Sequence, residues 1–297
     1  SRLILETDKP TLIKKAKIRA IIVIFIMICS IISFLKIKND SKRWVDADVT
    51  VKLPFEIDIL STGKSDFILI EAEGKFIIID CGFYENSTKI KEFLNYKDVE
   101  EIEYLILSHN DKDHIGGAPI ILDNFKINNL VQADYEKNTV QYKNYIEAVE
   151  RNELNPILLH SNIITNINGA KITIYPAIKD TYDKSNDYSI IVGVDYGKYR
   201  FLFTGDAEDE RMKEFIEEDT GNYTFLKMAH HGIYNDEVGK FLESVSPSYA
   251  AITCSYFMYP DRKLISLLNE QKIKTFYTSS GDISIKSDGE NIYFIQK

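Results

Sequence analysis

The hydrophobic and polar positions divide the chain into an apolar segment near the N-terminus, a short polar stretch and a long region of short elements. In this long region, brief runs rich in Ile, Val, Phe and Tyr are separated by Gly-containing turns, a pattern that predicts β-strands. Apolar positions of helical period lie between several of these runs. The predicted strands are residues 55–60, 66–70, 75–80, 103–107, 171–175, 188–194, 200–203, 224–228, 249–253, 275–277, 283–286 and 292–295. The predicted helices are residues 87–96, 136–152, 208–218, 236–244 and 262–271.

The order of these elements indicates the fold class. Strands and helices form two halves of similar size, and each half opens with strands. Because each sheet has an apolar face to bury, this order predicts two sheets packed face to face with helices on the outside. We therefore expect residues 53–297 to form one domain of the α/β class, an αββα sandwich.

The apolar segment covers residues 20–35, which carry no charge and are rich in Ile. It is slightly shorter than the roughly 20 residues that a membrane-spanning helix needs, but the flanking Arg19 and Lys36 can extend their charged ends to the interface. No small-residue cleavage site follows it, which favours an uncleaved transmembrane anchor over a cleaved signal peptide. The basic residues before it predict a cytoplasmic segment 1–19, and residues 36–52 read as a linker. The sequence thus predicts a single-pass protein of the cell membrane whose folded domain lies outside the cytoplasm.

The charge of the chain is unevenly distributed. The net charge is −9, but residues 1–43 hold ten Lys or Arg against three acidic residues and so contribute +7. Residues 44–297 therefore carry −16, and a domain of this charge repels polyanions on average. A nucleic acid would need a local basic groove and metal ions to bind here, so a small ester is the more compatible partner.

Potential metal ligands crowd one loop, directly after the predicted strand 103–107. They are His109, Asn110, Asp111, Asp113 and His114. On an extended chain, alternate positions point the same way, so His109 and Asp111 can bind one metal while Asp113 and His114 bind another. Mixed imidazole and carboxylate ligands suit Zn²⁺, Mn²⁺ or Fe²⁺. The loop therefore predicts a metal site.

Two further predicted strands end in residues of the same kind. Asp206 follows the strand 200–203, and His230 and His231 follow the strand 224–228. Four of the five histidines lie in these three segments, which disfavours the alternative of a solvated acidic loop with incidental histidines. The fifth, His160, has no acidic neighbour in the sequence and is interpreted as structural.

These motifs resemble those of the metallo-β-lactamase superfamily, and within it the hydrolase domain of ComEC-type competence proteins. That branch carries H-x-D-x-D-H, as residues 109–114 do here. Its I-D-T-G, N-x-x-S and L-T-G-D motifs are similar to residues 79–82, 186–189 and 203–206. The resemblance runs from about Phe55 to the C-terminus and implies the metallo-β-lactamase fold.

The resemblance also implies two divalent metal ions, Zn²⁺ or Mn²⁺, and a role for each ligand. His109 and Asp111 would hold the first metal, Asp113 and His114 the second, and Asp206 both. His230 would complete the second site, with His231 close by or in its place, and Asp80 would support the loop without binding metal. The sequence departs from the family at three places: Ile233 follows the His-His-Gly, residues 259–261 lack the histidine of Y-G-H-P, and no third histidine motif lies between the loop and Asp206.

We interpret the chain as a membrane-anchored hydrolase in which a metal-bridging hydroxide attacks a phosphodiester. Asp113 would orient the nucleophile, and His231 or Asn186 would contact the substrate. The same chemistry permits hydrolysis of a lactone, a thioester or a cell-wall phosphoester. A third interpretation is a degenerate, non-catalytic binding module, because some family motifs are incomplete.

Overall fold

The computed structural model describes residues 52–296, so the predicted anchor at residues 20–35 and the segment 1–19 lie outside the described residues. Within residues 52–296, no helix has both the length and the apolar character needed to cross a membrane. Residues Leu53–Lys297 form one compact unit.

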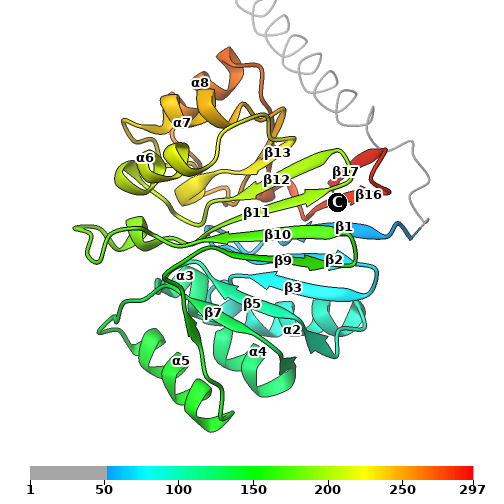
Figure 1. The fold of residues 1–297 in the computed structure, drawn as a ribbon, viewed down its shortest axis with the longest axis vertical. Helices are drawn as coiled ribbons and strands as arrows, with labels where there is room; N and C mark the ends of the chain where they lie inside the picture. Colours follow the sequence, from blue (N-terminus) through cyan, green and yellow to red (C-terminus); the bar gives the residue numbers. More distant parts are fainter. Residues whose placement is uncertain (1–51, 297) are drawn as a thin grey trace, which may run out of the picture. The chain divides into compact units, whose positions relative to one another are not determined.

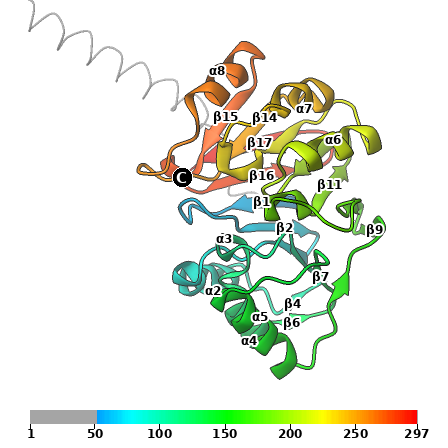
Figure 2. The ribbon, with the colours of Figure 1, turned by 90° about the vertical axis from the view of Figure 1, so that its left-hand side faces the viewer.

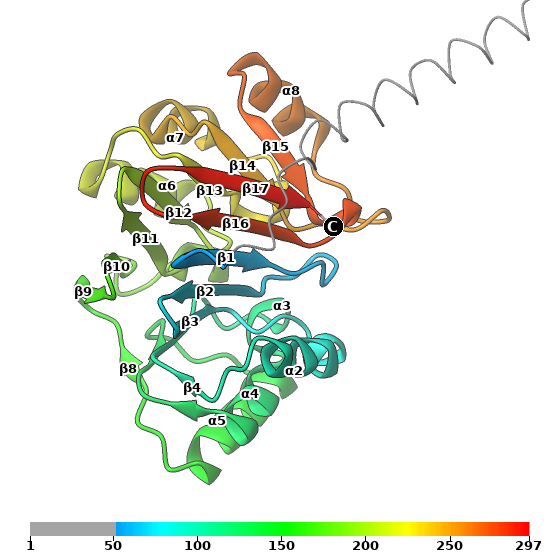
Figure 3. The ribbon, with the colours of Figure 1, turned by 90° about the vertical axis from the view of Figure 1, so that its right-hand side faces the viewer.

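The first sheet has eight strands in the order β17-β16-β1-β2-β3-β5-β7-β8. Neighbouring strands from β17 to β3 pair antiparallel, whereas β3, β5, β7 and β8 pair parallel. Figure 3 shows β16 and β17, in red, beside β1, in blue, so the two ends of this unit share one sheet. The strands are β1 (Phe55–Ile59), β2 (Ile68–Ala72), β3 (Lys75–Ile79), β5 (Tyr104–Leu107), β7 (Leu130–Gln132), β8 (Ile157–Leu158), β16 (Ile283–Ser287) and β17 (Ile292–Gln296).

The second sheet has seven strands in the order β15-β14-β13-β12-β11-β10-β9. The strands from β12 to β15 are parallel, and the strands from β9 to β12 are antiparallel. They are β9 (Ile163–Ile167), β10 (Ala170–Tyr175), β11 (Ile191–Tyr196), β12 (Tyr199–Phe203), β13 (Phe225–Lys227), β14 (Tyr249–Ile252) and β15 (Lys274–Tyr277). A separate short pair joins β4 (Glu101–Ile102) to β6 (Lys126–Ile127).

Helices cover the outer face of each sheet, as Figures 1 and 2 show. Three of them, α2 (Ser87–Tyr96), α4 (Ala118–Asn124) and α5 (Val140–Arg151), pack against the first sheet. Another three, α6 (Asp209–Glu218), α7 (Val238–Val245) and α8 (Arg262–Glu270), pack against the second. Between the two sheets lies a third apolar cluster, to which strands of both contribute. The predicted αββα sandwich is confirmed.

Two predicted elements begin later in the structure than the sequence pattern indicated. The predicted strand 188–194 begins only at Ile191, because Ser185–Tyr188 forms a 3₁₀ turn, η2. The predicted helix 136–152 begins at Val140, where the Thr139 hydroxyl accepts a hydrogen bond of 3.2 Å from the Tyr142 N–H. Residues 136–139 therefore form a loop. Strands β7 and β9 and helix α4 were not predicted, since β7 and α4 are short and β9 is interrupted by Thr165 and Asn166.

Candidate metal centre

The predicted ligands lie at the carboxyl ends of strands from both sheets. Strand β5 leads into His109, β12 leads into Asp206, and β13 leads into the turn η3 (Ala229–Gly232), which carries both histidines. Because β12 and β13 are adjacent parallel strands, their carboxyl ends meet at one edge. Loops between packed layers at such an edge are a common position for a binding site.

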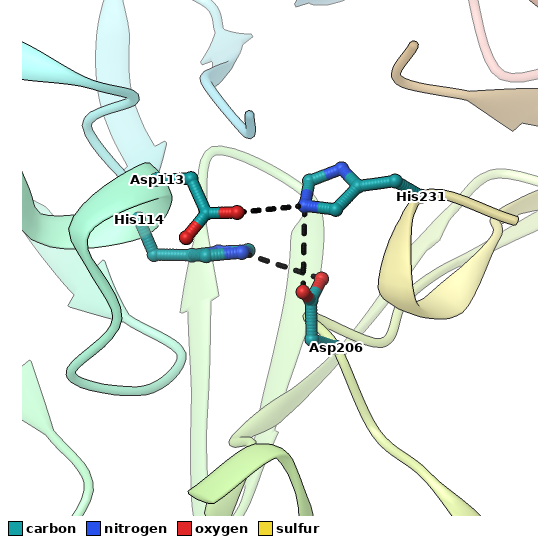
Figure 4. Close-up of side chains that lie close together, drawn as sticks. All are labelled: Asp113, His114, Asp206 and His231. Carbon is teal, nitrogen blue, oxygen red and sulfur yellow. Dashed lines mark ion pairs between the residues drawn. The ribbon is translucent and has the colours of Figure 1, made fainter. Parts of the chain in front are cut away.

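Four side chains converge at this edge: Asp113, His114, Asp206 and His231. One ligand atom from each lies within 4.8 Å of the others. Asp206 is central, since its two carboxylate oxygens lie 3.3 Å from Nε2 of His114 and 3.3 Å from Nε2 of His231. The same His231 nitrogen lies 3.3 Å from Oδ2 of Asp113 (Figure 4). Imidazole nitrogens and carboxylate oxygens in this number form a ligand set for a divalent transition metal.

Unsatisfied polar atoms support this interpretation. Oδ1 of Asp206 and Nε2 of His109, His114 and His231 are buried and have no hydrogen-bond partner among the described residues. A buried polar atom without a partner costs roughly 1–3 kcal/mol, so four together need a compensating ligand. A divalent cation would satisfy the atoms of Asp206, His114 and His231, because each is a lone-pair donor once the imidazoles are deprotonated at Nε2. The residues therefore fit the metal that the family resemblance implies.

Asp80 holds the ligand loop from behind. Its carboxylate accepts hydrogen bonds from the Ser108 N–H at 2.7 Å and the Ser108 hydroxyl at 2.8 Å, and lies 2.7 Å from Nδ1 of His114. A carboxylate on Nδ1 leaves Nε2 of the same imidazole free to face a metal. Burial alone would lower the pKa of His114, but Asp206 and Asp80 raise it well above its ordinary value. The surrounding carboxylates thus attract positive charge to this point.

A second buried carboxylate, Asp66, supports His231 in a similar way. The Thr253 hydroxyl donates to Oδ1 of Asp66 at 2.6 Å and lies 2.8 Å from Nδ1 of His231. The other Asp66 oxygen forms an ion pair with Lys227, whose side chain is fully buried. Lys227 also donates to the carbonyl oxygen of Gly205 at 3.3 Å, beside Asp206. This buried ion pair ties the end of β13 to the loop that precedes β2.

His109 and Asp111 lie next to the central four but outside that group. Nε2 of His109 is 3.9 Å from Oδ1 of Asp111, and the His109 ring lies 4.1 Å from the His114 ring, centroid to centroid. Burial and the neighbouring His114 lower the pKa of His109 to about 4, which keeps its imidazole neutral at neutral pH. The Asp111 carboxylate forms an ion pair with Lys137.

His230 lies outside the central four. Its Nδ1 lies 3.0 Å from Oε1 of Glu208 and 3.3 Å from Nδ2 of Asn186, and its Nε2 is 3.9 Å from Asp206. Both His230 and His231 have left-handed backbone conformations, with φ of 47° and 53°. Such conformations cost of order 1–3 kcal/mol each for non-Gly residues and cluster at functional sites. The turn sends the two adjacent side chains in different directions, and the histidine brought into the group is His231.

The prediction that alternate ligands point the same way assumed an extended chain over residues 109–114. The structure differs, because only part of this loop is extended. Lys112–Ile115 forms a single helical turn, α3, with Asp111 as its N-cap residue. Asp113 and His114 are therefore separated by a helical rotation rather than by strand alternation. The glycine before Asp206 is required by space: a Cβ on Gly205 would lie 2.8 Å from the Cβ of Ser108. This close approach brings the ends of β5 and β12 together.

A comparison with protein families assigns the fold to a superfamily. The model of the metallo-β-lactamase superfamily matches residues 61–255, two thirds of the chain. The chain belongs to this superfamily. It is 23% identical to ComE operon protein 3 of Bacillus subtilis over 75% of this chain and 32% of that protein. It is 29% identical to Recombination protein 2 of Haemophilus influenzae over 68% of this chain and 24% of that protein.

A third relative is Competence protein ComA of Neisseria gonorrhoeae, which is 24% identical over 75% of this chain and 30% of that protein. The chain thus spans about a third or less of the length of these relatives, and the predicted resemblance to competence proteins is confirmed.

Solved structures agree on the fold. The metallo-β-lactamase fold protein YhfI of Bacillus subtilis superposes with a TM-score of 0.51, at 12% identity, over 81% of this chain and all of that one. The diiron β-hydroxylase CmlA of Streptomyces venezuelae does so with a TM-score of 0.52, at 10% identity, over 80% of this chain and 55% of that one.

Several residues of this candidate site were not singled out from the sequence, among them Lys227, Thr253 and Lys137. Lys227 ends a buried strand three positions before His230, and a lysine among apolar neighbours is a signal that could have been used. Thr253 directly follows the last residue of the buried strand β14. Lys137 carries no such signal, because it lies in an ordinary polar stretch. The isolated His160 is exposed, and its Nε2 lies 3.4 Å from Oδ2 of Asp134.

Proposed function

We propose that this superfamily member is a metal-dependent hydrolase that cleaves phosphodiester bonds at the outer side of a membrane. The observation that carries the proposal is the group Asp113, His114, Asp206 and His231, whose buried nitrogens and carboxylate oxygens converge on one point. Three residues of the group are at most 2% exposed, so the site excludes bulk water on its inner side. Such preorganised, desolvated charge is the usual basis of catalysis of this type.

The central four residues would hold a divalent metal, and His109 with Asp111 would form a second position beside it that shares Asp206. Bound there, a divalent metal, Zn²⁺ or Mn²⁺, supplies Lewis acidity that polarises a phosphoryl oxygen and makes water acidic enough to act as a nucleophile near neutral pH. Asp113 is the most exposed of the four, at 19% of its side chain, and its Oδ2 faces His231. Its carboxylate would orient the nucleophile by accepting a hydrogen bond from it.

The outer rim would contact the substrate. Asn186 and His230 lie together there, and a cavity of about 330 Å³ opens beside His230, lined also by Lys184, Glu208 and Tyr234. The N–H groups of Asn186 and His230 can donate to the non-bridging oxygens of a phosphoester. Lys64 adds positive charge near His230, and the described residues show no ion pair for it. A local cation offsets the acidic surface that would otherwise repel an anion.

The substrate class can be tested directly with the full chain purified in detergent. We expect bis(p-nitrophenyl) phosphate to be hydrolysed in Mn²⁺ or Zn²⁺, and a lactone and a thioester to react at least tenfold more slowly. Treatment with a chelator should abolish turnover, and added metal should restore it. The charge of −16 on residues 44–297 favours a small phosphoester, for example of the cell wall, over a polymer such as single-stranded DNA. A faster lactone or thioester reaction would overturn the phosphodiester assignment.

The anchor is a separate part of the proposal and rests on the sequence of residues 20–35 alone. We expect the full chain to sediment with membranes and to resist extraction by high salt and alkaline carbonate, because a spanning helix is held by the hydrophobic effect. A chain lacking residues 1–43 should appear in the soluble fraction and retain metal-dependent turnover. Release of the full chain by carbonate would contradict the anchor.

A further inference from the structure

Lys137 lies beside the candidate metal centre, although no metal-binding motif includes it. Its ammonium forms an ion pair with Oδ1 of Asp111 and lies 3.3 Å from the Ser185 hydroxyl. That same Asp111 oxygen faces Nε2 of His109 at 3.9 Å. The ammonium is therefore paired with the same carboxylate oxygen that would coordinate a metal bound between His109 and Asp111.

The loop that carries Lys137 is fastened to the ligand loop. Asn110, between the two predicted ligands, donates its N–H to the Tyr135 hydroxyl at 2.7 Å and its side-chain amide to the Tyr135 carbonyl at 2.6 Å. The Tyr135 ring stacks on Tyr188 with centroids 4.1 Å apart. Thr139 caps helix α5 two residues after Lys137. Lys137 is thus held between fixed points, and only 26% of its side chain is exposed.

The two metal positions differ in their ligands. The position at Asp113 has four ligand-type residues with converging atoms. At the second position His109 lies near Asp111 and Asp206, but among residues 52–296 neither His109 nor Asp111 belongs to a group of three or more converging ligand atoms. A transition metal in proteins usually has at least three protein ligands. The second position has so few ligands that an ammonium on the Asp111 carboxylate is enough to prevent a metal from binding there.

We propose that the Lys137 ammonium takes the place of one of the two metal cations, so that the centre binds a single divalent metal tightly. This metal lies at Asp113, His114, Asp206 and His231, and a second metal binds only when Lys137 is removed from Asp111. The inference rests on the proposed metal dependence, but not on the identity of the substrate. Lys137 supplies a fixed positive charge beside the site, where an anionic substrate oxygen would approach.

Metal stoichiometry tests this inference without reference to activity. The full chain in detergent is stripped with a chelator and titrated with Mn²⁺, and bound metal is counted by electron paramagnetic resonance of the free ion. We expect one equivalent for the wild type and a second, weaker equivalent for Lys137→Met, which removes the charge but keeps most of the side-chain volume. Lys137→Arg retains the cation and should bind one equivalent.

Two controls separate Lys137 from general charge effects. Lys143→Met removes an exposed lysine from the groove that Lys137 also lines and should leave one equivalent. The double variant Lys137→Met with Asp111→Asn should return from two equivalents to one, because it removes the ligand that Lys137 covered. Two equivalents in the wild type, or only one in Lys137→Met, would overturn the inference while leaving the metal centre intact. No bound metal in the folded wild type would overturn the proposed function, and the inference with it.

Discussion

Replacing Asp206 by Asn is expected to lower kcat/KM for the phosphodiester by a factor on the order of a thousand or more. The carboxylate is 2% exposed and lies 3.3 Å from both His114 and His231, so it is the residue that the other ligands share. Loss of metal-based charge stabilisation is worth several kcal/mol, and roughly 1.4 kcal/mol is tenfold in rate. Turnover and bound metal measured on the same preparation should fall together.

The matched control for this variant is Asp236→Asn, an exposed aspartate that lines the cavity beside His230. It removes the same charge near the site but no ligand atom, and kcat/KM should stay within a few fold of the wild type. Asn has nearly the same shape as Asp, so Asp206→Asn is expected to fold. A thermal melt checks that it does. Undiminished turnover in folded Asp206→Asn would remove Asp206 from the mechanism.

His231→Ala and His230→Ala are expected to differ sharply, although the residues are adjacent. His231 belongs to the central group and is fully buried, so its replacement should abolish tight metal binding and with it turnover. His230 lies at the rim with Glu208, so its replacement should leave the bound metal in place and lower kcat/KM by roughly tenfold, as for loss of one substrate hydrogen bond. Equilibrium dialysis against Mn²⁺ measures the difference.

The opposite result, loss of metal in His230→Ala and retention in His231→Ala, would show that His230 is the ligand. Each variant controls for the other, because both remove an imidazole from the same turn and both leave an alanine in a left-handed backbone conformation. A change in stability common to both therefore cancels.

Most of the fold could be predicted from the sequence because its strands are brief apolar runs bounded by turns. Helix α2 was predicted at its observed limits, 87–96, and the strand ends that carry His109 and Asp206 were located within a residue. Failures occurred where tertiary contacts override local preference. Residues 136–139 have a helical pattern, yet the hydrogen bonds between Asn110 and Tyr135 hold the preceding chain in a loop.

The candidate site was predicted in outline and not in detail. The segments containing His109 to His114, Asp206 and the two histidines do converge, as three strand ends with ligand-type residues suggested. Which histidine faces the group depends on two left-handed residues, which no local pattern of non-Gly residues signals. Lys137 meets Asp111 only through the folding of a loop 26 residues away in sequence. Contacts of this kind depend on the tertiary structure and produce no periodic pattern in the sequence from which they could be predicted.

The most direct test of the account is the metal content of the purified full chain, measured by inductively coupled plasma mass spectrometry after saturation with Mn²⁺ or Zn²⁺ and desalting. The account predicts at least one tightly held divalent ion per chain, lost in Asp206→Asn and in His231→Ala. A folded wild-type chain that retains no metal would contradict it, because the buried atoms of Asp206, His114 and His231 would then converge for some other reason.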